Sequence, residues 1–158
     1  MNAPILGGMS VFANQSIIRV IILVVDGVSL TTVSTALEPF QQVNSMLGED
    51  RFHIQLVSLS STDPMTSAGI PIPCHLTSTD VLAKLKLQNR PDLLILCCGH
   101  VTSPINQASA GKFVQKFARQ NVPVFALGAA CLIAAKTAMI KGGKCATHWK
   151  MISSLAEQ

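Results

Sequence analysis

Charged residues are scarce in this chain: Asp, Glu, Lys and Arg make up 13% of its 158 residues, whereas 49% are hydrophobic. So few charges leave much of the surface neutral or covered by another molecule. Because symmetric dimers are the commonest oligomers, we expect a homodimer. The formal net charge of +4 is spread along the chain without a basic block. It is too diffuse to predict nucleic-acid binding by this segment itself.

Long apolar runs are also lacking. The longest of them, such as 17–25, are broken by Arg19 or ended by Asp26. Runs of about 8 residues suit buried strands, whereas a membrane-spanning helix needs about 20. The segment before Ile17 has neither an early basic cluster nor a long apolar stretch. We therefore expect no membrane span and no signal peptide.

The cysteines form no Cys-x-x-Cys pair, and their number is odd. They are Cys74, Cys97, Cys98, Cys131 and Cys145. Cys97 and Cys98 are adjacent in a strand-like run, so their side chains should point to opposite faces and cannot easily bind one metal ion. This usage predicts reduced, mostly buried thiols in a cytoplasmic protein, and no metal or cofactor.

Strand-like and helix-like segments alternate along the chain. Strands are predicted at 17–25, 52–59, 93–98, 122–127 and 144–147, helices at 35–47, 80–87, 108–120, 128–140 and 149–156, and a turn with a short strand pair at 60–73. This alternation predicts an α/β fold, with a mainly parallel central sheet covered by helices on both faces. The continuous apolar run at 122–127 predicts a strand near the sheet centre. Thr35 and Glu38 have the spacing of a capping box, which predicts that the first helix starts at Thr35. Pro39 directly follows this pair, and proline is tolerated only near the start of a helix.

Three strand ends are candidates for a site, because sites in open α/β sheets form beyond the carboxyl ends of the strands. These ends are Asp26-Gly27, Gly99-His100 and Gly128-Ala129. The third has the form of a nucleophile elbow, in which a strand turns sharply into a helix and the turning residue projects into the site. An enzyme would have Ser or Cys there, whereas Gly128 has no side chain.

Three blocks of sequence carry a resemblance to a known family. They are 122–149 (VPVFALGAACLIAAKTAMIKGGKCATHW), 24–44 (VVDGVSLTTVSTALEPFQQVN) and 91–99 (PDLLILCCG). In this order and spacing they resemble the elbow, the first turn and helix, and the Pro-Asp strand of ThiJ/PfpI domains, within the class I glutamine amidotransferase-like superfamily. The Thr-His-Trp ending is similar to the branch that is fused to AraC-type regulators.

The resemblance implies a flavodoxin-like sandwich that forms a single sensor domain over 1–158. It also implies an AraC-type helix-turn-helix domain downstream, absent from this sequence, through which alone DNA would be bound. The last helix pattern stops abruptly at Gln158, so we expect the domain to be truncated at its C-terminal end. Domains of this kind respond to a small-molecule effector, such as an amino acid or a small nitrogenous metabolite.

The departures from the family matter as much as the matches. Catalytic relatives carry an acid in the first turn, a cysteine at the elbow and often a histidine after the last strand. These positions hold Thr32, Gly128 and His148. A lone imidazole cannot replace a missing nucleophile, so we expect no catalysis. The first of the two family glycines after the Pro-Asp strand is replaced by Cys98.

The candidate ligand-binding residues follow from the strand ends and the family positions. They are Asp26, Thr32, Gly99, His100, Gly128, Ala129 and His148. Several have a structural alternative: Asp26 would close a turn, and His148 would bond the backbone near Trp149. Trp149 itself is expected to pack, and the Cys131 thiol to point into the interior one turn into its helix.

Three functions compete on this sequence. The first is a regulatory sensor that binds an effector and dimerises. The second is a ThiJ/PfpI enzyme (hydratase, glyoxalase-like or protease-like) with a displaced nucleophile, for which Cys131 and Cys98 are the only candidates. The third is a dimerising scaffold without a ligand.

Overall fold

The computed structural model describes residues 17–60, 63–84, 90–99, 103–137, 146–147 and 149–157. Its strands are β1 (Ile18–Val24), β2 (Phe52–Ser58), β3 (Leu76–Thr77), β4 (Leu93–Cys98) and β5 (Val124–Gly128). Its helices are α1 (Leu30–Leu47), α2 (Ser78–Lys84), α3 (Pro104–Ala118), α4 (Ala130–Lys136) and α5 (Ile152–Ala156), the last preceded by the 3-10 turn η3 (Trp149–Met151). Strands and helices alternate as the sequence predicts.

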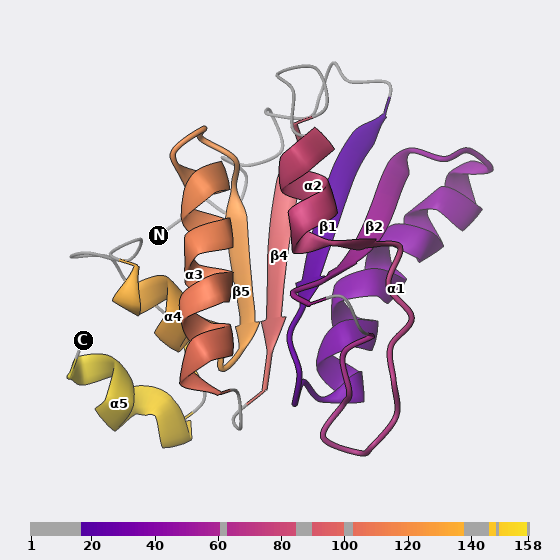
Figure 1. The fold of residues 1–158 in the computed structure, drawn as a ribbon. Coiled ribbons are helices and arrows are strands. Elements are labelled where there is room, and N and C mark those ends of the chain that lie inside the picture. Colours follow the sequence, from indigo (N-terminus) through magenta and orange to yellow (C-terminus); the bar gives the residue numbers. More distant parts are fainter. Residues whose placement is uncertain are drawn as a thin grey trace, which may run out of the picture.

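All five strands are parallel and form one sheet in the order β3-β2-β1-β4-β5 (Figure 1). β1 occupies the centre, and Arg19 is its only exposed residue. The prediction of a mainly parallel sheet is therefore confirmed. The predicted central position of the 122–127 strand is wrong, because β5 lies at the end of the described sheet. Val124 and Ala126 of β5 pack against the helices on one face of the sheet, whereas Phe125 on the other face is 56% exposed.

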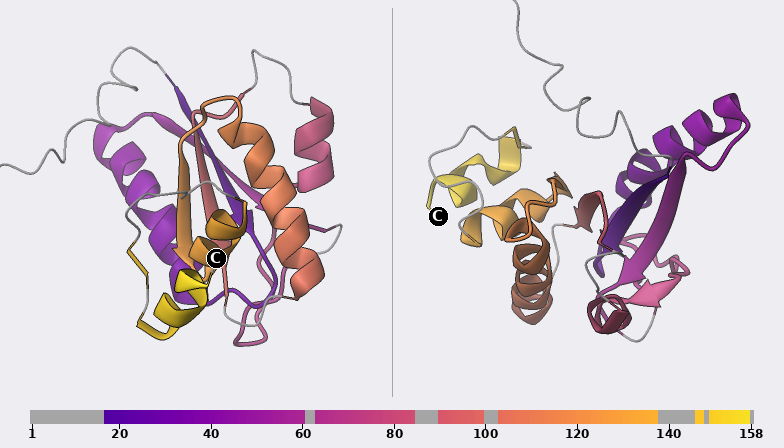
Figure 2. Two further views of the ribbon diagram at one scale, coloured as in Figure 1. Left: turned by 90° about the vertical axis from the view of Figure 1, so that its left-hand side faces the viewer. Right: turned by 90° about the horizontal axis from the view of Figure 1, so that it is seen from above.

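Helices cover both faces of the sheet, as predicted. On one face, Val33 and Ala36 of α1 pack against alternate residues of β1 and β4. On the other face, α2, α3 and α4 pack against the remaining residues of these strands, with Phe113 and Phe117 of α3 in ring contact. The view from above in Figure 2 shows α1 on one side of the sheet and α2 and α3 on the opposite side. None of the helices in the described ranges combines the length and the apolar character needed to cross a bilayer.

The first helix begins five residues earlier than predicted. Ser29 is its N-cap, and its side chain accepts the Thr32 N–H. Pro39 lies inside α1, and the helix continues through it to Leu47. A proline in a helix interior removes one backbone hydrogen bond, and here the packing of Val33 and Ala36 outweighs that loss. The capping-box spacing at Thr35 therefore marks no helix start.

Other predicted boundaries shift by a few residues. α3 begins at Pro104, because Ser103 caps it and proline is well suited to the first helical turn. α2 begins at Ser78, and the last residues predicted for it, 85–87, lie outside the described residues. The predicted 128–140 helix is observed as α4, and 138–140 lie outside as well. Of the predicted 144–147 strand, Ala146 and Thr147 are not in a strand, and 144–145 are not described. Within 60–73, the predicted strand pair is a single antiparallel bridge between Met65 and Pro71.

A side chain joins α1 to the start of β2. The amide of Asn44 donates to the Phe52 carbonyl and accepts the Phe52 N–H, both at 2.8 Å. The two bonds imitate the pairing of a neighbouring strand. They fix the start of β2 relative to α1, and the rings of Phe40 in α1 and Phe52 in β2 are also in contact.

Replacing Asn44 by alanine should therefore destabilise the fold. We expect Asn44→Ala to lower the free energy of unfolding by about 1–3 kcal/mol, because the partly buried polar groups of Phe52 lose their partners. Gln42→Ala, an exposed position on the same helix, should change it by less than about 0.5 kcal/mol. Urea unfolding of both variants measures the difference, and equal stabilities would contradict this account of Asn44.

Candidate functional site

The carboxyl ends of β1, β4 and β5 meet at one edge of the sheet. Val24 pairs with Cys97, and Cys98 pairs with Gly128. The three strand ends singled out in the sequence are therefore neighbours, as expected for parallel strands. The start of α1 lies at the same edge, directly after β1.

Gly128 is the turning residue of a sharp strand-to-helix elbow. It ends β5, and α4 begins two residues later at Ala130. Its φ of +68° lies in the left-handed region, and the residue is exposed. This is the strained turn of a nucleophile elbow, built with the residue that adopts it at least cost.

Thr32 faces this elbow from the first turn of α1. A Cβ atom added to Gly128 would lie 3.7 Å from the Thr32 hydroxyl oxygen. The Thr32 hydroxyl is held by Ser29, whose Oγ lies 2.8 Å from it and also accepts the Thr32 N–H. The position that the resemblance assigns to the family acid thus lies opposite the one it assigns to the nucleophile. In this chain the first position carries the Thr32 hydroxyl group, and the second, Gly128, has no side chain.

The carbonyl oxygen of Cys98 occupies the space beside the elbow. A Cβ atom on Gly128 would overlap this oxygen. The same oxygen accepts the Ala129 N–H at 3.0 Å. In catalytic elbows the N–H of the residue after the nucleophile helps to bind an oxyanion. Here that N–H donates to strand β4.

Gly99 contributes close backbone packing. A Cβ atom on Gly99 would overlap the carbonyl oxygen of Gly27, which itself has a φ of +81°. The turn after β1 and the end of β4 therefore touch, and they touch only because both residues are glycine.

Asp26 bonds a neighbouring loop. Its Oδ1 accepts the Met65 N–H at 2.9 Å, and Gly27 N–H donates to the Met65 carbonyl at 2.8 Å. This agrees with the structural alternative for Asp26, because the carboxylate helps to hold the loop between β2 and β3 against the turn. His100 and His148, the two imidazoles predicted for the site, lie outside the described residues.

The thiols nearest the elbow are buried. Cys131 is 3% exposed, and its Sγ lies 3.0 Å from the Thr147 hydroxyl and 3.7 Å from the Gly128 carbonyl oxygen. It points into the interior, as predicted. Cys97 and Cys98 belong to the cores on opposite faces of the sheet, also as predicted.

Burial makes two of the thiols poor acids. It is the main cause that raises the pKa of Cys97 to about 12, with Cys98 adding to it. Burial and the carboxylate of Asp63 raise the pKa of Cys74 to about 11. The thiolate is the reactive form of cysteine, so both groups are unreactive at neutral pH. Among the described residues, no three His, Cys, Asp or Glu side chains are grouped so as to hold a metal ion.

Sequence reasoning missed two members of this site. Ser29 orients Thr32. The sequence sign of this role is a serine just before an apolar helix face, which is typical of an N-cap, but Pro39 made a helix start so far upstream look unfavourable. The Cys98 carbonyl is a backbone group, and its position depends on the pairing of β4 with β5. No residue type in the sequence predicts it. Trp149, expected to pack, is 69% exposed.

Comparison with solved structures shows the same architecture in other proteins. An AraC family transcriptional regulator from Pseudomonas putida is 20% identical, with a TM-score of 0.74 over 89% of this chain and 71% of that chain. A provisionally named protease I from Bacteroides thetaiotaomicron is 18% identical, with a TM-score of 0.71 over 87% and 78%. A provisionally named transcriptional regulator from Vibrio parahaemolyticus is 14% identical, with a TM-score of 0.66 over 89% and 72%. At these identities the likeness concerns the fold.

By sequence, the chain matches no curated protein. It does match the family model of the DJ-1/PfpI family over residues 18–158. This range contains the described sheet, the elbow and all the helices around them. The chain is a member of the DJ-1/PfpI family.

Proposed function

We propose that this chain is the effector-binding and dimerisation domain of an AraC-type transcriptional regulator and that it has no catalytic activity. The observation that carries the proposal is the elbow itself. It keeps the shape of a catalytic turn, but Gly128 faces the hydroxyl of Thr32, and the Cys98 carbonyl lies where a nucleophile's Cβ would be. Regulators among the structural neighbours support the same function. DNA would be bound by a helix-turn-helix domain outside this sequence, in the cytoplasm, where free thiols such as those of the described cysteines persist.

The effector would bind over the exposed backbone of Gly128. Thr32 and Ser29 offer hydroxyl groups there, on a helix start that is fixed by its own cap. Gly99, Ala129 and Asp26 shape the surrounding backbone. His100, which follows the central strand, and His148, at the family's histidine position, would complete the site. A small polar metabolite, such as an amino acid, is the class of effector that the family resemblance suggests.

A thermal-shift screen of amino acids and small nitrogenous metabolites tests this site. A ligand present at 100 times its Kd should stabilise the folded chain by about 2.7 kcal/mol and raise its Tm. Thr32→Val keeps the shape of the side chain but removes the hydroxyl, so we expect the ligand-induced shift to fall. Thr35→Val, one turn further along α1 and exposed, should leave the shift unchanged. A shift that is insensitive to Thr32→Val would place the effector elsewhere.

The burial of the thiols supports the absence of catalysis. A displaced nucleophile would have to be Cys131 or Cys98, which are 3% and 2% exposed. Cys131 lies beneath the elbow against Thr147, and Cys98 belongs to the core formed with α2, α3 and α4. A substrate carbonyl cannot reach either sulfur without displacing this packing.

We expect no hydratase, glyoxalase or amidase turnover from the purified chain. Alkylation of Cys74 should be slow at neutral pH and should keep rising up to about pH 11, because its pKa is raised to that value. Mass spectrometry after timed alkylation measures each cysteine separately. Turnover that disappears on Cys131→Ser would show a displaced nucleophile and refute the proposal.

Restoring the nucleophile should fail for a steric reason. Gly128→Cys should give no turnover and should destabilise the chain more than Gly48→Cys does. Gly48 also has a positive φ, but a Cβ there has nothing within 4 Å, so it incurs only the left-handed strain of about 1 kcal/mol. At Gly128 the overlap with Cys98 should add about 1–3 kcal/mol. Urea unfolding of the pair measures this difference, and equal losses would contradict the predicted overlap.

We also propose that the chain forms a homodimer through apolar surface around β5 and α5. Phe125, Trp149 and Ile152 are 56%, 69% and 58% exposed. Light scattering should show a dimer, and Phe125→Glu should shift it to monomer. Met46→Glu, at an 86% exposed position on α1, should not. A wild-type chain that stays monomeric at high concentration would refute the dimer.

A further inference from the structure

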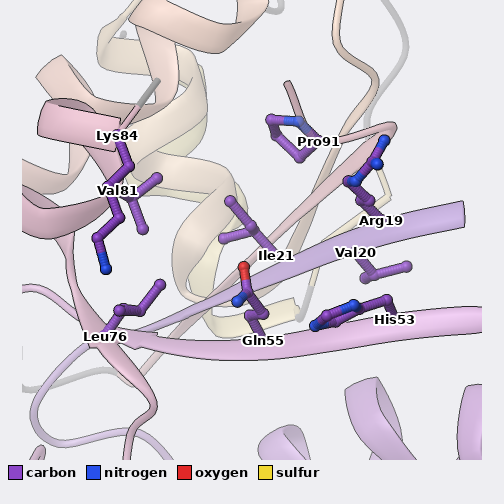
Figure 3. A pocket seen from close by; sticks show the side chains of 9 residues that line it. All are labelled: Arg19, Val20, Ile21, His53, Gln55, Leu76, Val81, Lys84 and Pro91. Carbon is purple, nitrogen blue, oxygen red and sulfur yellow. The ribbon is translucent and has the colours of Figure 1, made fainter. Parts of the chain in front are cut away.

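A cavity lies on the face of the sheet that carries α2, towards the amino end of β1 and away from the elbow. Its volume is about 300 Å³, at the low end of the range for small-molecule sites. Its floor consists of two cross-strand pairs, Arg19 with His53 and Ile21 with Gln55. Lys84 of α2 closes one side, as Figure 3 shows.

The polar residues in this floor are out of place for a covered sheet. Strands that are covered by helices usually present continuous apolar residues, and β1 does so from Val20 onwards. Arg19, His53 and Gln55 instead lie on the same face as Ile21, which belongs to the core beneath the helices. α2 has seven residues and buries Val81, so it covers only part of this face.

The charges of the cavity are of one sign. Arg19 and Lys84 are cationic, and none of the nine described residues that line the cavity is acidic. Within the described residues, the side chains of Arg19, His53, Gln55 and Lys84 form no ion pair and no hydrogen bond. Four donor-bearing side chains therefore line one cavity with no hydrogen-bond or ion-pair partner among these residues.

The nearest acids are engaged elsewhere. Asp92 Oδ2 accepts the backbone N–H of Arg19 at 2.8 Å. Asp80 Oδ2 accepts the N–H and the hydroxyl of Thr77, and these bonds are the main reason why the pKa of Asp80 is lowered, with Lys84 contributing least. Neither carboxylate lines the cavity, so its positive character remains.

We propose that this cavity binds a small, elongated dianion of the dicarboxylate class. In Figure 3, Arg19 and Lys84 lie at opposite ends of the cavity, with Ile21 and Gln55 between them. One carboxylate would meet Arg19 beside His53, and the other would meet Lys84. The carbon chain would lie on Ile21 and Val81, with the Gln55 amide as a central donor. Guanidinium and ammonium groups are suited to these two ends, the guanidinium because it can bind a carboxylate through two donors.

The cavity does not have the form of a nucleic-acid surface. Phosphate backbones are bound by extended rows of Lys and Arg. Here two cations flank a small, partly open cavity with an apolar wall, and the chain has no basic block. The cavity is also separate from the proposed effector site, because neither Thr32 nor Gly128 is among the described residues that line it.

Titration calorimetry with succinate and glutarate tests the proposal, with butyrate and succinamide as singly charged and neutral controls. We expect saturable binding of a dicarboxylate that weakens as salt is added and is stronger than binding of butyrate. Arg19→Gln and Lys84→Gln should each raise the Kd about fivefold or more. Lys116→Gln, an exposed cation of α3 outside the cavity, should leave the Kd unchanged.

The sharpest variant is Gln55→Glu, which keeps the side-chain shape but puts a negative charge at the middle of the cavity. It should abolish dicarboxylate binding while Thr32→Val leaves it intact. If circular dichroism shows that Gln55→Glu does not fold, the test depends on the Kd values of Arg19→Gln and Lys84→Gln, which change exposed side chains. The proposal is overturned if no dicarboxylate binds saturably, or if Lys116→Gln weakens binding as much as Lys84→Gln. It is also overturned if duplex DNA, and not succinate, depends on Arg19 and Lys84.

Discussion

The contact between the end of β4 and the two turns beside it determines the geometry of the whole carboxyl edge. Gly99 lies against the carbonyl of Gly27, and the Cys98 carbonyl lies against Gly128 while accepting the Ala129 N–H. A Cβ atom at position 99 or 128 would overlap the neighbouring carbonyl oxygen, so glycine is required at both positions. Because these backbones touch, β1, β4 and β5 end at one level, and α1 and α4 both start beside the same edge.

This constraint explains how the elbow is held with glycine at its turning position. A catalytic elbow needs room for a nucleophile and a free N–H for the developing oxyanion. In this chain the Cys98 carbonyl fills that room and takes the Ala129 N–H. The backbone bond stabilises this turn around a residue that has no side chain. The turn therefore does not depend on a side chain at position 128, and the hydroxyl group of Thr32 faces it.

The sequence predicted the fold well where the signal was local and apolar. The buried runs of β1 and β4, and the opposite orientations of Cys97 and Cys98, follow from the alternation of side chains along a strand. The edge position of β5 could not be predicted in this way, because an apolar run does not say which strands flank it. The start of α1 was missed because Pro39 is unfavourable by local propensity, whereas tertiary packing decides in its favour. In the site, Gly128 and Thr32 were found by position, but the Cys98 carbonyl has no signature in the residue types.

The segment 63–84 links the two edges of the sheet. At the carboxyl edge Met65 is bonded to Asp26 and Gly27. Further along, Leu76, Val81 and Lys84 line the basic cavity. β1 also runs between the two proposed sites, but all of its residues after Arg19 are buried, so it is firmly packed. Coupling between two ligands requires an element with two arrangements that both of them bias. Of the two elements, the segment 63–84 is held less firmly, because it joins the sheet through the two-residue strand β3 and is exposed at many positions. An anion bound to Lys84 would act on α2. Helix α2 is joined through β3 to the loop that Asp26 holds. We therefore expect any coupling between the two proposed sites to pass through this loop.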